Sequence, residues 1–539
     1  MSEQSLYRWD QAKKTFDCKP CCPKCFAPIL EPEERAVLTR CEQEDCQALM
    51  EWVEHPQKTG GSWFWPRLSN ENYSTLDGHK YQHPSPLDWC EFGGNSDRNG
   101  FIEDPEQHIF GKPTREKRFA LKKAWSYELS AKKDVHSLMI MHGYLVIVYH
   151  NGTFDILSNI NGSQAESFIS QNRVFNDDNT PETFRFTPAC RYPYVFLTNE
   201  KEVIIWRMRT KNQQEHLQRF NIDAELVEEG YHLIGSPTSF YYKTKLGFAF
   251  TLVNHKQDWK NSYLCFCWQD KEDENFNHQM IPLQVSLQRP MIYVASQQLF
   301  VGIAFYGQLA VSLSLEEIWK APESVTAQNH LTKGLAVQIP NHHRNTVALR
   351  LDIKKQQELV VVHRHPNPNI PTKHLSYLRL KDWTWTSFPV KSDSLIDIHN
   401  ISVGSNTKGR NSQSSFTDKV SITTTEGVYH FTCKGEPWGK PFTTAITHGI
   451  GVVHRDASII CGAGIINKVR GKLSIYWKRV WGRGTERHDY MTSLASRSGL
   501  AIFEERVFIV DTKSKLDTTP AIVAIDIVKE DTKKKTQNG

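Results

Sequence analysis

The sequence predicts a mainly β protein whose larger part is a β-propeller of about seven blades, between six and eight, preceded by a small cysteine-rich module. Three observations lead to this fold class. Helical periodicity is almost absent after residue 120. Short apolar runs rich in Val, Ile, Phe and Tyr alternate with polar turns. Pairs of such runs recur about every 40 to 60 residues, and a repeat near this length in a chain without helices is typical of a propeller.

The composition is that of a large folded protein. The chain has 539 residues, which is more than one hydrophobic core usually serves. Hydrophobic residues make up 39% of it and charged residues 23%, which excludes a mostly disordered chain. The formal charge of +5 is small for this length, so the overall charge does not indicate binding to nucleic acid or to an anionic membrane.

The first residues, MSEQSLYRWDQAKKTFD, lack the basic and then apolar pattern of a signal peptide, and we therefore expect a cytoplasmic protein. Pro290 to Leu315 carries no charge and is long enough to span a membrane. However, Gln297, Gln298 and Gln308 divide it into runs of strand length. We predict a buried strand-turn-strand unit there and no membrane span.

Six of the twelve cysteines lie between Cys18 and Cys46. Cys22 and Cys25 form a C-x2-C pair, and Cys41 and Cys46 form a second pair after fifteen intervening residues. Four thiolates in two pairs are a standard ligand set for tetrahedral zinc. This unit resembles a zinc ribbon, although its second pair has the spacing C-x4-C and no glycine follows either pair. Zinc held by four cysteines has no open coordination position, so we expect it to support folding and not catalysis.

Other uses of these cysteines stay open. Cys18 and Cys21 form an overlapping C-x2-C pair that competes for the metal. A thioredoxin-like redox motif needs a βαβ context, which the sequence does not predict here. A disulfide framework is the weaker alternative in a chain without an export signal.

Changes in composition along the chain give the predicted order of the domains. Residues 1–55 form the zinc-ribbon-like module, and residues 56–118 form a connector rich in Gly, Pro and aromatic residues that packs on its neighbours. Residues 119–529 form the propeller, and residues 530–539 form a disordered tail. Only two short helices are predicted in the propeller, at Asp223 to Glu229 and Leu315 to Trp319.

The propeller prediction depends on successive hairpin-like units. A pair of β-sandwiches is the alternative, because regular strand spacing also fits that fold. The units are His136 to Ser158, Tyr192 to Arg209, Phe240 to Asn254, Met291 to Leu313, Thr346 to Arg364, Lys419 to Thr432, His448 to Gly464 and Ser498 to Lys513.

Residues 95–106 match part of the EF-hand calcium loop. Asn95, Asp97, Asn99 and Glu106 supply oxygen atoms at the appropriate spacing, and Gly100 occupies the position of the sharp turn. Asn95 replaces the usual Asp, and neither flank is predicted to be helical. A polar turn centred on Gly100 is therefore the preferred interpretation over a calcium site.

The sequence contains no nucleophile elbow, Walker loop or dinucleotide-binding glycine motif, so we do not expect an enzyme. The histidines around a Pro-Asn loop lack a companion carboxylate motif, and we expect them at loop and strand-end surface positions. These histidines are His342, His343, His363, His365 and His374.

Two segments, Lys112 to Trp125 and Tyr476 to His488, interleave basic and aromatic residues. Such a surface neutralises phosphates and stacks on bases. Lys478, Arg479, Trp481 and Arg483 are the candidate nucleic-acid contacts. A strand edge protected by charge has the same composition.

The leading hypothesis is a non-enzymatic scaffold that binds other proteins through the loop faces of a propeller. The combination of modules is similar to bacterial β-propeller components that accompany an AAA+ ATPase and a von Willebrand A-type protein, and this resemblance implies such proteins as partners. The alternatives are a nucleic-acid-binding protein that uses the zinc module and the basic-aromatic segments, and a hydrolase with a site at the propeller centre.

Overall fold

The computed structural model describes most of residues 117–438 and 500–531, apart from connecting segments of which the longest are 163–185, 334–346 and 404–418. Strands in residues 9–68, 101–102 and 442–499 are described by their backbone alone. The chain divides into two compact units, Met1–Lys80 with Thr210–Gln214 and Tyr81–Arg209 with Glu215–Gly539.

The first unit contains two small antiparallel sheets among its described residues. In one of them, β4 and β5 pair continuously from Met50 with Leu68 to Pro56 with Ser62, so this hairpin runs through the predicted module boundary at residue 55. The strands are β1 (Trp9–Asp10) and β2 (Thr15–Phe16) in one sheet, and β3 (Thr39–Arg40), β4 (Leu49–Pro56) and β5 (Ser62–Leu68) in the other.

The described part of the second unit consists of eight sheets that follow one another along the chain, and they are antiparallel apart from one short parallel strand in the seventh. The first sheet contains β8 (Val135–Met141), β9 (Tyr144–Tyr149) and β10 (Phe154–Ser158). The second contains β11 (Ala189–Arg191), β12 (Tyr194–Thr198), β13 (Glu202–Arg207) and β14 (His216–Asn221). The third contains β15 (Tyr231–Tyr242), β16 (Lys245–Asn254), β17 (Ser262–Gln269) and β18 (Phe276–Pro282).

The next three sheets repeat this four-stranded arrangement. The fourth contains β19 (Ile292–Val294), β20 (Leu299–Ile303), β21 (Leu309–Ser314) and β22 (Gln328–Leu331). The fifth contains β23 (Val347–Leu351), β24 (Gln357–Arg364), β25 (Lys373–Arg379) and β26 (Thr384–Pro389). The sixth contains β27 (Ile398–Val403), β28 (Lys419–Thr424), β29 (Gly427–Thr432) and β30 (Phe442–Thr443).

The last two sheets include strands from before the repeats. The seventh contains β31 (Gly451–His454), β32 (Ala457–Gly462), β33 (Gly471–Lys478) and β34 (Thr485–Thr492), and β6 (Phe101–Ile102) pairs in parallel with β31. The eighth contains β35 (Ala495–Phe503), β36 (Arg506–Asp511) and β37 (Ala521–Asp531), and β7 (Lys117–Glu128) is its outermost strand.

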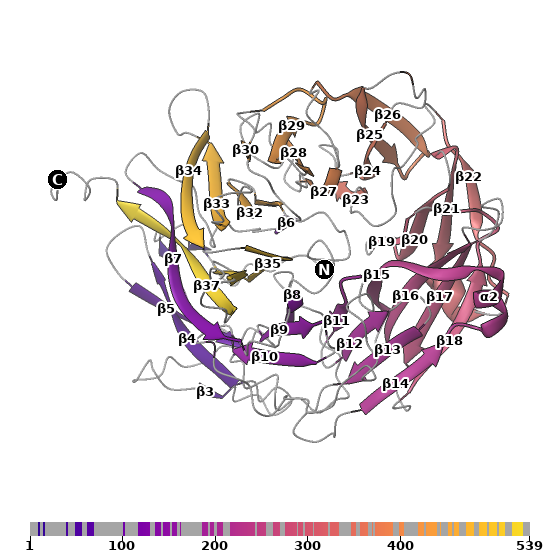
Figure 1. Ribbon diagram of the computed structural model, residues 1–539, viewed down its shortest axis with the longest axis horizontal. Helices are drawn as coiled ribbons and strands as arrows, with labels where there is room; N and C mark the ends of the chain where they lie inside the picture. Colours follow the sequence, from indigo (N-terminus) through magenta and orange to yellow (C-terminus); the bar gives the residue numbers. More distant parts are fainter. Residues whose placement is uncertain are drawn as a thin grey trace. The chain divides into compact units, whose positions relative to one another are not determined.

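The pairing of β7 with β37 joins the beginning of the repeats to their end. It runs from Ala521 opposite Glu128 to Asp531 opposite Lys117. Because the first sheet then packs against the eighth, the described sheets follow each other around a closed ring, as Figure 1 shows for this unit. The predicted mainly β propeller is confirmed, and the count of eight sheets lies within the predicted range of six to eight.

The core of the propeller lies between neighbouring sheets and not inside any one of them. One cluster joins the eighth sheet to the first, and others join the second to the third, the third to the fourth, the fourth to the fifth and the fifth to the sixth. Middle strands are therefore apolar on both faces, and every residue of β9 is buried. The outermost strand β22 is largely exposed, and its Leu331 is 79% exposed.

The two predicted helices are present. Helix α2 (Ala224–Glu229) begins after Asp223, whose carboxylate accepts a hydrogen bond from the Glu225 N–H, and it ends at Gly230 in the left-handed conformation. Helix α3 (Leu315–Lys320) begins after Ser314 and buries Leu315 and Ile318. No helix among the described residues has the length and apolar character to cross a membrane. The uncharged segment 290–315 instead contains β19, β20 and β21, as the strand-turn-strand prediction required.

Candidate functional site

The candidate site lies where the fifth and sixth sheets meet. Arg350 on β23 directs Nε and Nη2 at one carboxylate oxygen of Glu358 on β24, at 3.2 and 3.0 Å. Its Nη1 lies 2.7 Å from Sγ of Cys433, which directly follows β29. The guanidinium also lies over the ring of Tyr377, 4.3 Å from the ring centre. We call Arg350, Glu358, Tyr377 and Cys433 the Arg350 cluster.

The pairing of the strands explains how these residues meet. Arg350 and Glu358 are opposite each other in the β23–β24 ladder, and Tyr377 comes from β25 of the same sheet. Cys433 comes from the neighbouring sheet and is 83 residues from Arg350 in sequence. The side chains of Arg350 and Glu358 are 11% and 10% exposed, so this ion pair is more shielded from water than a surface pair.

The electrostatics of the Arg350 cluster favour the charged guanidinium. Burial alone would lower the pKa of Arg350, but Cys433, Tyr377 and Glu358 raise this pKa above its ordinary value. Burial and then the nearby Cys433 sulfur raise the pKa of the Tyr377 hydroxyl well above its ordinary value, although Arg350 opposes this effect. Tyr377 is therefore a neutral phenol that can donate a hydrogen bond. Its buried hydroxyl interacts with the Cys433 sulfur.

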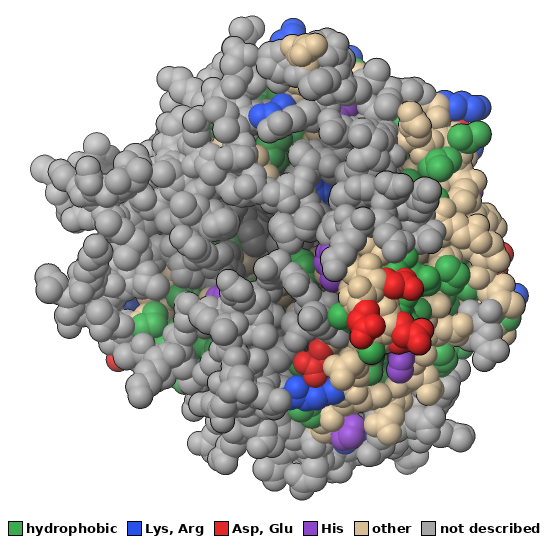
Figure 2. Space-filling view, turned by 45° about the vertical axis from the view of Figure 1, so that its right-hand side comes forward, with side chains coloured by type: hydrophobic (Ala, Val, Ile, Leu, Met, Phe, Trp, Pro, Cys, Tyr) green, Lys and Arg blue, Asp and Glu red, His purple; other side chains and the backbone are tan. Residues whose placement is uncertain are grey.

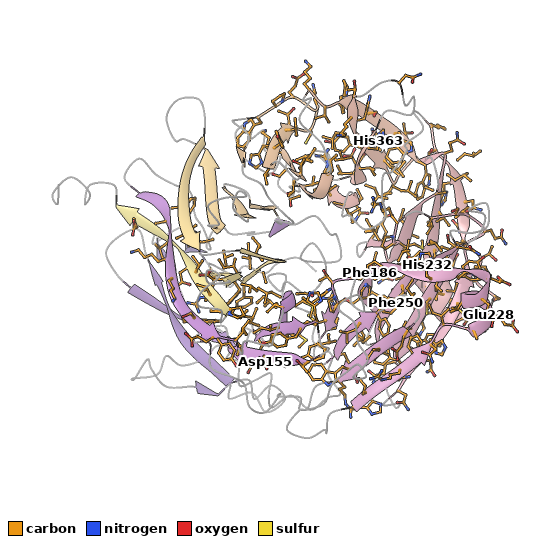
Figure 3. The ribbon with its side chains drawn as sticks, in the orientation of Figure 1. Asp155, Phe186, Glu228, His232, Phe250 and His363 are labelled. Atoms are coloured by element: carbon orange, nitrogen blue, oxygen red, sulfur yellow. The ribbon has the colours of Figure 1, made fainter. Side chains whose placement is uncertain are left out.

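A second polar group lies within the fifth sheet. His363 is fully buried, and its Nε2 is 2.6 Å from Oγ of Ser376 on the adjacent strand. The Ser376 Oγ is 2.5 Å from Oγ of Ser387, which is 3.3 Å from Nδ1 of His374. Figure 3 labels His363 among the side chains of the sheets. The expectation that His363 is at the surface was wrong, because a serine on the next strand supplies the partner that allows a histidine to be buried.

Similar histidine–serine pairs occur in the two neighbouring sheets. In the fourth sheet, His330 Nε2 is 2.7 Å from Ser312 Oγ, and the His330 ring stacks on Trp383 with the ring centres 3.9 Å apart. In the sixth sheet, His430 Nδ1 is 2.8 Å from Ser421 Oγ. Burial lowers the pKa of His430 to about 4 and also lowers the pKa of His330. These histidines are therefore neutral at neutral pH.

The histidine–serine pairs are structural in their chemistry. A serine activated by histidine acts as a nucleophile only where a substrate can reach its hydroxyl. Ser376 and Ser421 are fully buried and Ser312 is 3% exposed, so none of them can meet a substrate. Among the described residues, no group of three or more His, Cys, Asp or Glu side chains is placed to hold a metal ion. Cys433 in the Arg350 cluster differs from these serines because it is partly exposed.

Most residues predicted from the sequence to form sites lie outside the described part of the chain. This applies to the zinc ligands Cys22, Cys25, Cys41 and Cys46, to their alternatives Cys18 and Cys21, and to the calcium candidates Asn95, Asp97, Asn99 and Glu106. Of the nucleic-acid candidates, Lys478 ends β33, whereas Arg479, Trp481 and Arg483 are not described.

The other basic-aromatic segment is part of the propeller closure. Lys122 on β7 forms an ion pair of 2.8 Å with Glu530. Trp125 is partly buried against the core, with its ring centre 5.7 Å from that of Phe508. A Cβ atom on Gly162 would lie only 2.6 Å from the Trp125 ring, so Gly162 packs directly on the indole. In this segment the tryptophan is a packing residue and does not offer an open face to a base.

No local signal in the sequence marks the Arg350 cluster. Arg350 and Glu358 are ordinary strand residues, and Cys433 is isolated from the cysteine-rich N-terminal segment. The buried histidine–serine pairs carry no motif either. Ser421 and His430 are opposite each other only because β28 and β29 form a hairpin. A search for polar residues at buried hairpin positions would have found that pair.

Comparison with known proteins supplies no family for this chain. No family model matches it, and no curated protein matches it. Solved structures that resemble it include Hsv2 of Kluyveromyces lactis, with 11% identity over 67% of this chain and 98% of that chain and a TM-score of 0.35. A complex of KlAtg21 with the coiled-coil of AgAtg16 has 7% identity over 65% and 95% of the two chains and a TM-score of 0.35.

A protein of unknown function from Dyadobacter fermentans has 12% identity over 56% of this chain and 96% of that chain, with a TM-score of 0.27. These resemblances are too distant to carry a function. The propeller architecture is established by the chain's own sheets and by their closure through β7.

Proposed function

We propose that this protein is a non-enzymatic scaffold that binds other proteins through the loop faces of its propeller. The observation that carries the proposal is the closure of the ring by β7 and β37, which brings residues from the two ends of the repeat region into one sheet. A closed ring of sheets holds many loops in fixed positions, and this reduces the ordering cost of binding a partner.

Hydrogen bonds of polar groups between and within the sheets support a structural role for the ring. The Gln218 side chain joins the second sheet to the third through the backbone of Phe276. The Lys333 N–H donates to the Trp383 carbonyl at 3.0 Å, and this joins the fourth sheet to the fifth. Because these contacts hold the sheets together, we propose that partner proteins bind to the exposed segments that connect the sheets.

Among the described segments that connect the sheets, helix α2 is the first candidate for a partner-binding surface. It lies between the second and third sheets and buries none of its residues. Its exposed acidic side chains are Glu225, Glu228 and Glu229, preceded by the exposed Asp223. Figure 2 shows acidic side chains gathered on one face, and Figure 3 labels Glu228. Such a surface suits a partner with basic side chains.

A structural zinc module forms part of the proposal. Strands β3 and β4 pair with Arg40 opposite Leu49, and Cys41 and Cys46 lie between these two residues in sequence. A strand pair of this kind brings the two ends of a metal-binding knuckle together, which supports zinc coordination by these cysteines with Cys22 and Cys25. We propose that the zinc maintains the fold of this module and takes no part in a reaction.

The scaffold proposal is preferred to nucleic-acid binding because Trp125 packs against the core beside the closing sheet and Lys122 is paired with Glu530. The resemblance to propellers that accompany an AAA+ ATPase and a von Willebrand A-type protein suggests proteins of these two classes as partners.

The deciding experiment is co-purification of the tagged full-length chain from its native host, followed by mass spectrometry. We expect a specific partner that is absent from an untagged control. Its recovery should fall for the triple variant Glu225→Lys, Glu228→Lys, Glu229→Lys and not for Glu317→Lys, which reverses an exposed charge on the other helix, α3. A purified chain that retains no protein and instead hydrolyses an ester or phosphate substrate would overturn the proposal.

A further inference from the structure

We propose that Cys265, Cys267 and Met280 bind a single copper(I) ion on the face of the third sheet that packs against the second sheet. Cys265 and Cys267 are on β17, and Met280 is on the adjacent strand β18. Thiolate and thioether sulfurs are soft ligands, and this ligand class is typical of Cu(I). The site uses no residue of the Arg350 cluster or of the N-terminal cysteine pairs, and it does not depend on the scaffold proposal.

Strand geometry brings the three sulfur-bearing side chains to one face of the sheet. Cys265 and Cys267 are two residues apart on one strand, so their side chains lie on the same face. Met280 is directly opposite Cys265 in the β17–β18 ladder, and opposite residues of an antiparallel pair also share a face. All three side chains pack in or against the same hydrophobic cluster between the second and third sheets.

The two thiols are at a separation that a shared metal ion requires. Sγ of Cys265 and Sγ of Cys267 are 4.0 Å apart. With metal–sulfur bonds of about 2.3 Å, as in zinc thiolates, this separation gives a sulfur–metal–sulfur angle of about 120°, which suits a trigonal ion. No third His, Cys, Asp or Glu side chain among the described residues is placed to complete such a site. The Met280 thioether is therefore the proposed third ligand.

The surroundings of the two thiols favour a soft ion over a hard one. Cys267 is fully buried and Cys265 is 4% exposed. Their opposite residues on β16 are Phe248 and Phe250, of which Figure 3 labels Phe250. Hard cations such as Mg²⁺ and Ca²⁺ need oxygen ligands, which these side chains do not supply. Met280 is less buried and is on the outermost strand, so the metal ion can approach from that side.

Metal binding at this pair must release thiol protons. Burial, and then the neighbouring Cys265 thiol, raise the pKa of the Cys267 thiol well above its ordinary value. Cys267 is therefore a neutral thiol at neutral pH when no metal is bound. Because the metal ion competes with protons for the sulfur atoms, the affinity for Cu(I) should decrease as the pH falls.

The first test is copper uptake by the full chain, measured without oxygen and with a phosphine reductant that keeps the thiols reduced. Cu(I) is supplied from a coloured Cu(I) chelator, and its transfer to the protein is followed by the loss of colour. The native chain should take up one more Cu(I) ion than the double variant Cys265→Ala, Cys267→Ala. Since both chains have the same N-terminal cysteines, this difference reports on the pair alone. Cys190→Ala removes another buried thiol and should bind as much copper as the native chain.

Met280→Leu removes the thioether but keeps an apolar side chain of similar size, so the variant should remain folded. Its affinity for the Cu(I) ion bound by the pair should fall by at least about tenfold, because the loss of even an outer partner of a metal site typically has this effect. The matched control is Met291→Leu, which changes a buried methionine in the cluster between the third and fourth sheets and should leave the affinity unchanged.

A measurement on the native chain does not depend on how the variants fold. During alkylation at a fixed denaturant concentration, Cu(I) from the same chelator should slow the labelling of Cys265 and Cys267 more than that of Cys190, with each cysteine identified by mass spectrometry. Equal copper uptake by the native chain and the double variant would overturn the proposal. Equal slowing at all three cysteines, or an unchanged affinity in Met280→Leu, would overturn it as well.

Discussion

The side-chain amide of Gln218 forms two hydrogen bonds with the backbone of a single residue, Phe276, as a backbone amide in a neighbouring strand would. Its Nε2 donates to the Phe276 carbonyl at 2.8 Å, and its Oε1 accepts from the Phe276 N–H at 2.7 Å. Gln218 is on β14 and Phe276 begins β18, so the contact joins the outermost strands of two neighbouring sheets. Two residues further along each strand, Phe220 stacks on His278. The Gln218 side chain thus completes the pairing that a further strand would otherwise supply.

Replacement of Gln218 by Ala should therefore lower the free energy of unfolding by about 1 to 3 kcal/mol, because two backbone groups of Phe276 lose their partner. Chemical denaturation of the full chain measures this difference. Gln328→Ala is the matched control, since Gln328 is an exposed glutamine on the outermost strand β22. Equal midpoints for the two variants would show that the Gln218 contact does not stabilise the ring.

Gly435 should tolerate no side chain. Its φ is +77°, and a Cβ atom would lie 2.4 Å from the Pro389 carbonyl oxygen of the fifth sheet. Gly435→Ala should cost about 2 kcal/mol or more, because it combines backbone strain with a clash against backbone. Lys391→Ala removes only the exposed ion pair with Glu436 at the same place and should change stability by less than about 1 kcal/mol. Thermal unfolding of both variants compares the two stability losses. A loss for Gly435→Ala no larger than that for Lys391→Ala would mean that the turn can move away from Pro389.

His430 should make the folded state sensitive to acid. Its folded-state pKa is about 4, against 6.5 for an exposed histidine, because burial disfavours the charged ring. As the pH falls from 6.5 towards 4, the unfolded chain gains a proton at this position that the folded chain does not, so stability falls over this range. Each pH unit corresponds to about 1.4 kcal/mol, and the total loss should be of the order of 3 kcal/mol.

The measurement is the free energy of unfolding between pH 7 and pH 4 for the natural chain and for His430→Gln. The variant should show a smaller decrease over this interval, even if it is less stable at pH 7. His216→Gln, at the exposed contact with Asn275, is the matched histidine control. A slope that is identical in all three proteins would contradict this role for His430.

The N-terminal cysteines should bind about one zinc ion per chain. Replacement of Cys25 or Cys41 by Ser should release it, because each removes one of four ligands, whereas replacement of Cys18 should leave the zinc bound. Metal analysis of the chain purified without chelator, together with zinc release by a thiol-modifying reagent, gives the stoichiometry. Retention of full zinc content in Cys25→Ser, with loss in Cys18→Ser or Cys21→Ser, would reassign the ligands to the overlapping pair.

Much of the propeller could be predicted from sequence because its elements are local. Each of the eight predicted hairpin-like units falls within one described sheet, from β8–β10 at His136 to Ser158 to β35–β36 at Ser498 to Lys513. The two short helices were also predicted, since Asp223 and Ser314 act as N-terminal caps next to short polar-apolar runs. The predicted range of six to eight blades, with about seven favoured, includes the eight described sheets.

The sites could not be predicted in the same way. Motif spacing predicts a zinc site because its ligands are close in sequence, and those cysteines lie outside the described residues. The Arg350 cluster depends on the packing of the fifth sheet against the sixth, and the buried position of His363 depends on a serine in the neighbouring strand. None of these partners is at a spacing that a motif search would use.

The alternation of apolar runs and turns, and therefore the hairpins, follows from the sequence alone, because strand pairing across a short turn depends on residues that are close along the chain. The addition of β7 to the last sheet and the contact of Arg350 with Cys433 depend on how the sheets pack together. Both contacts join residues that are far apart along the chain, so no local pattern encodes them. They form because closing the ring buries the apolar faces between neighbouring sheets, and that burial places the polar partners together.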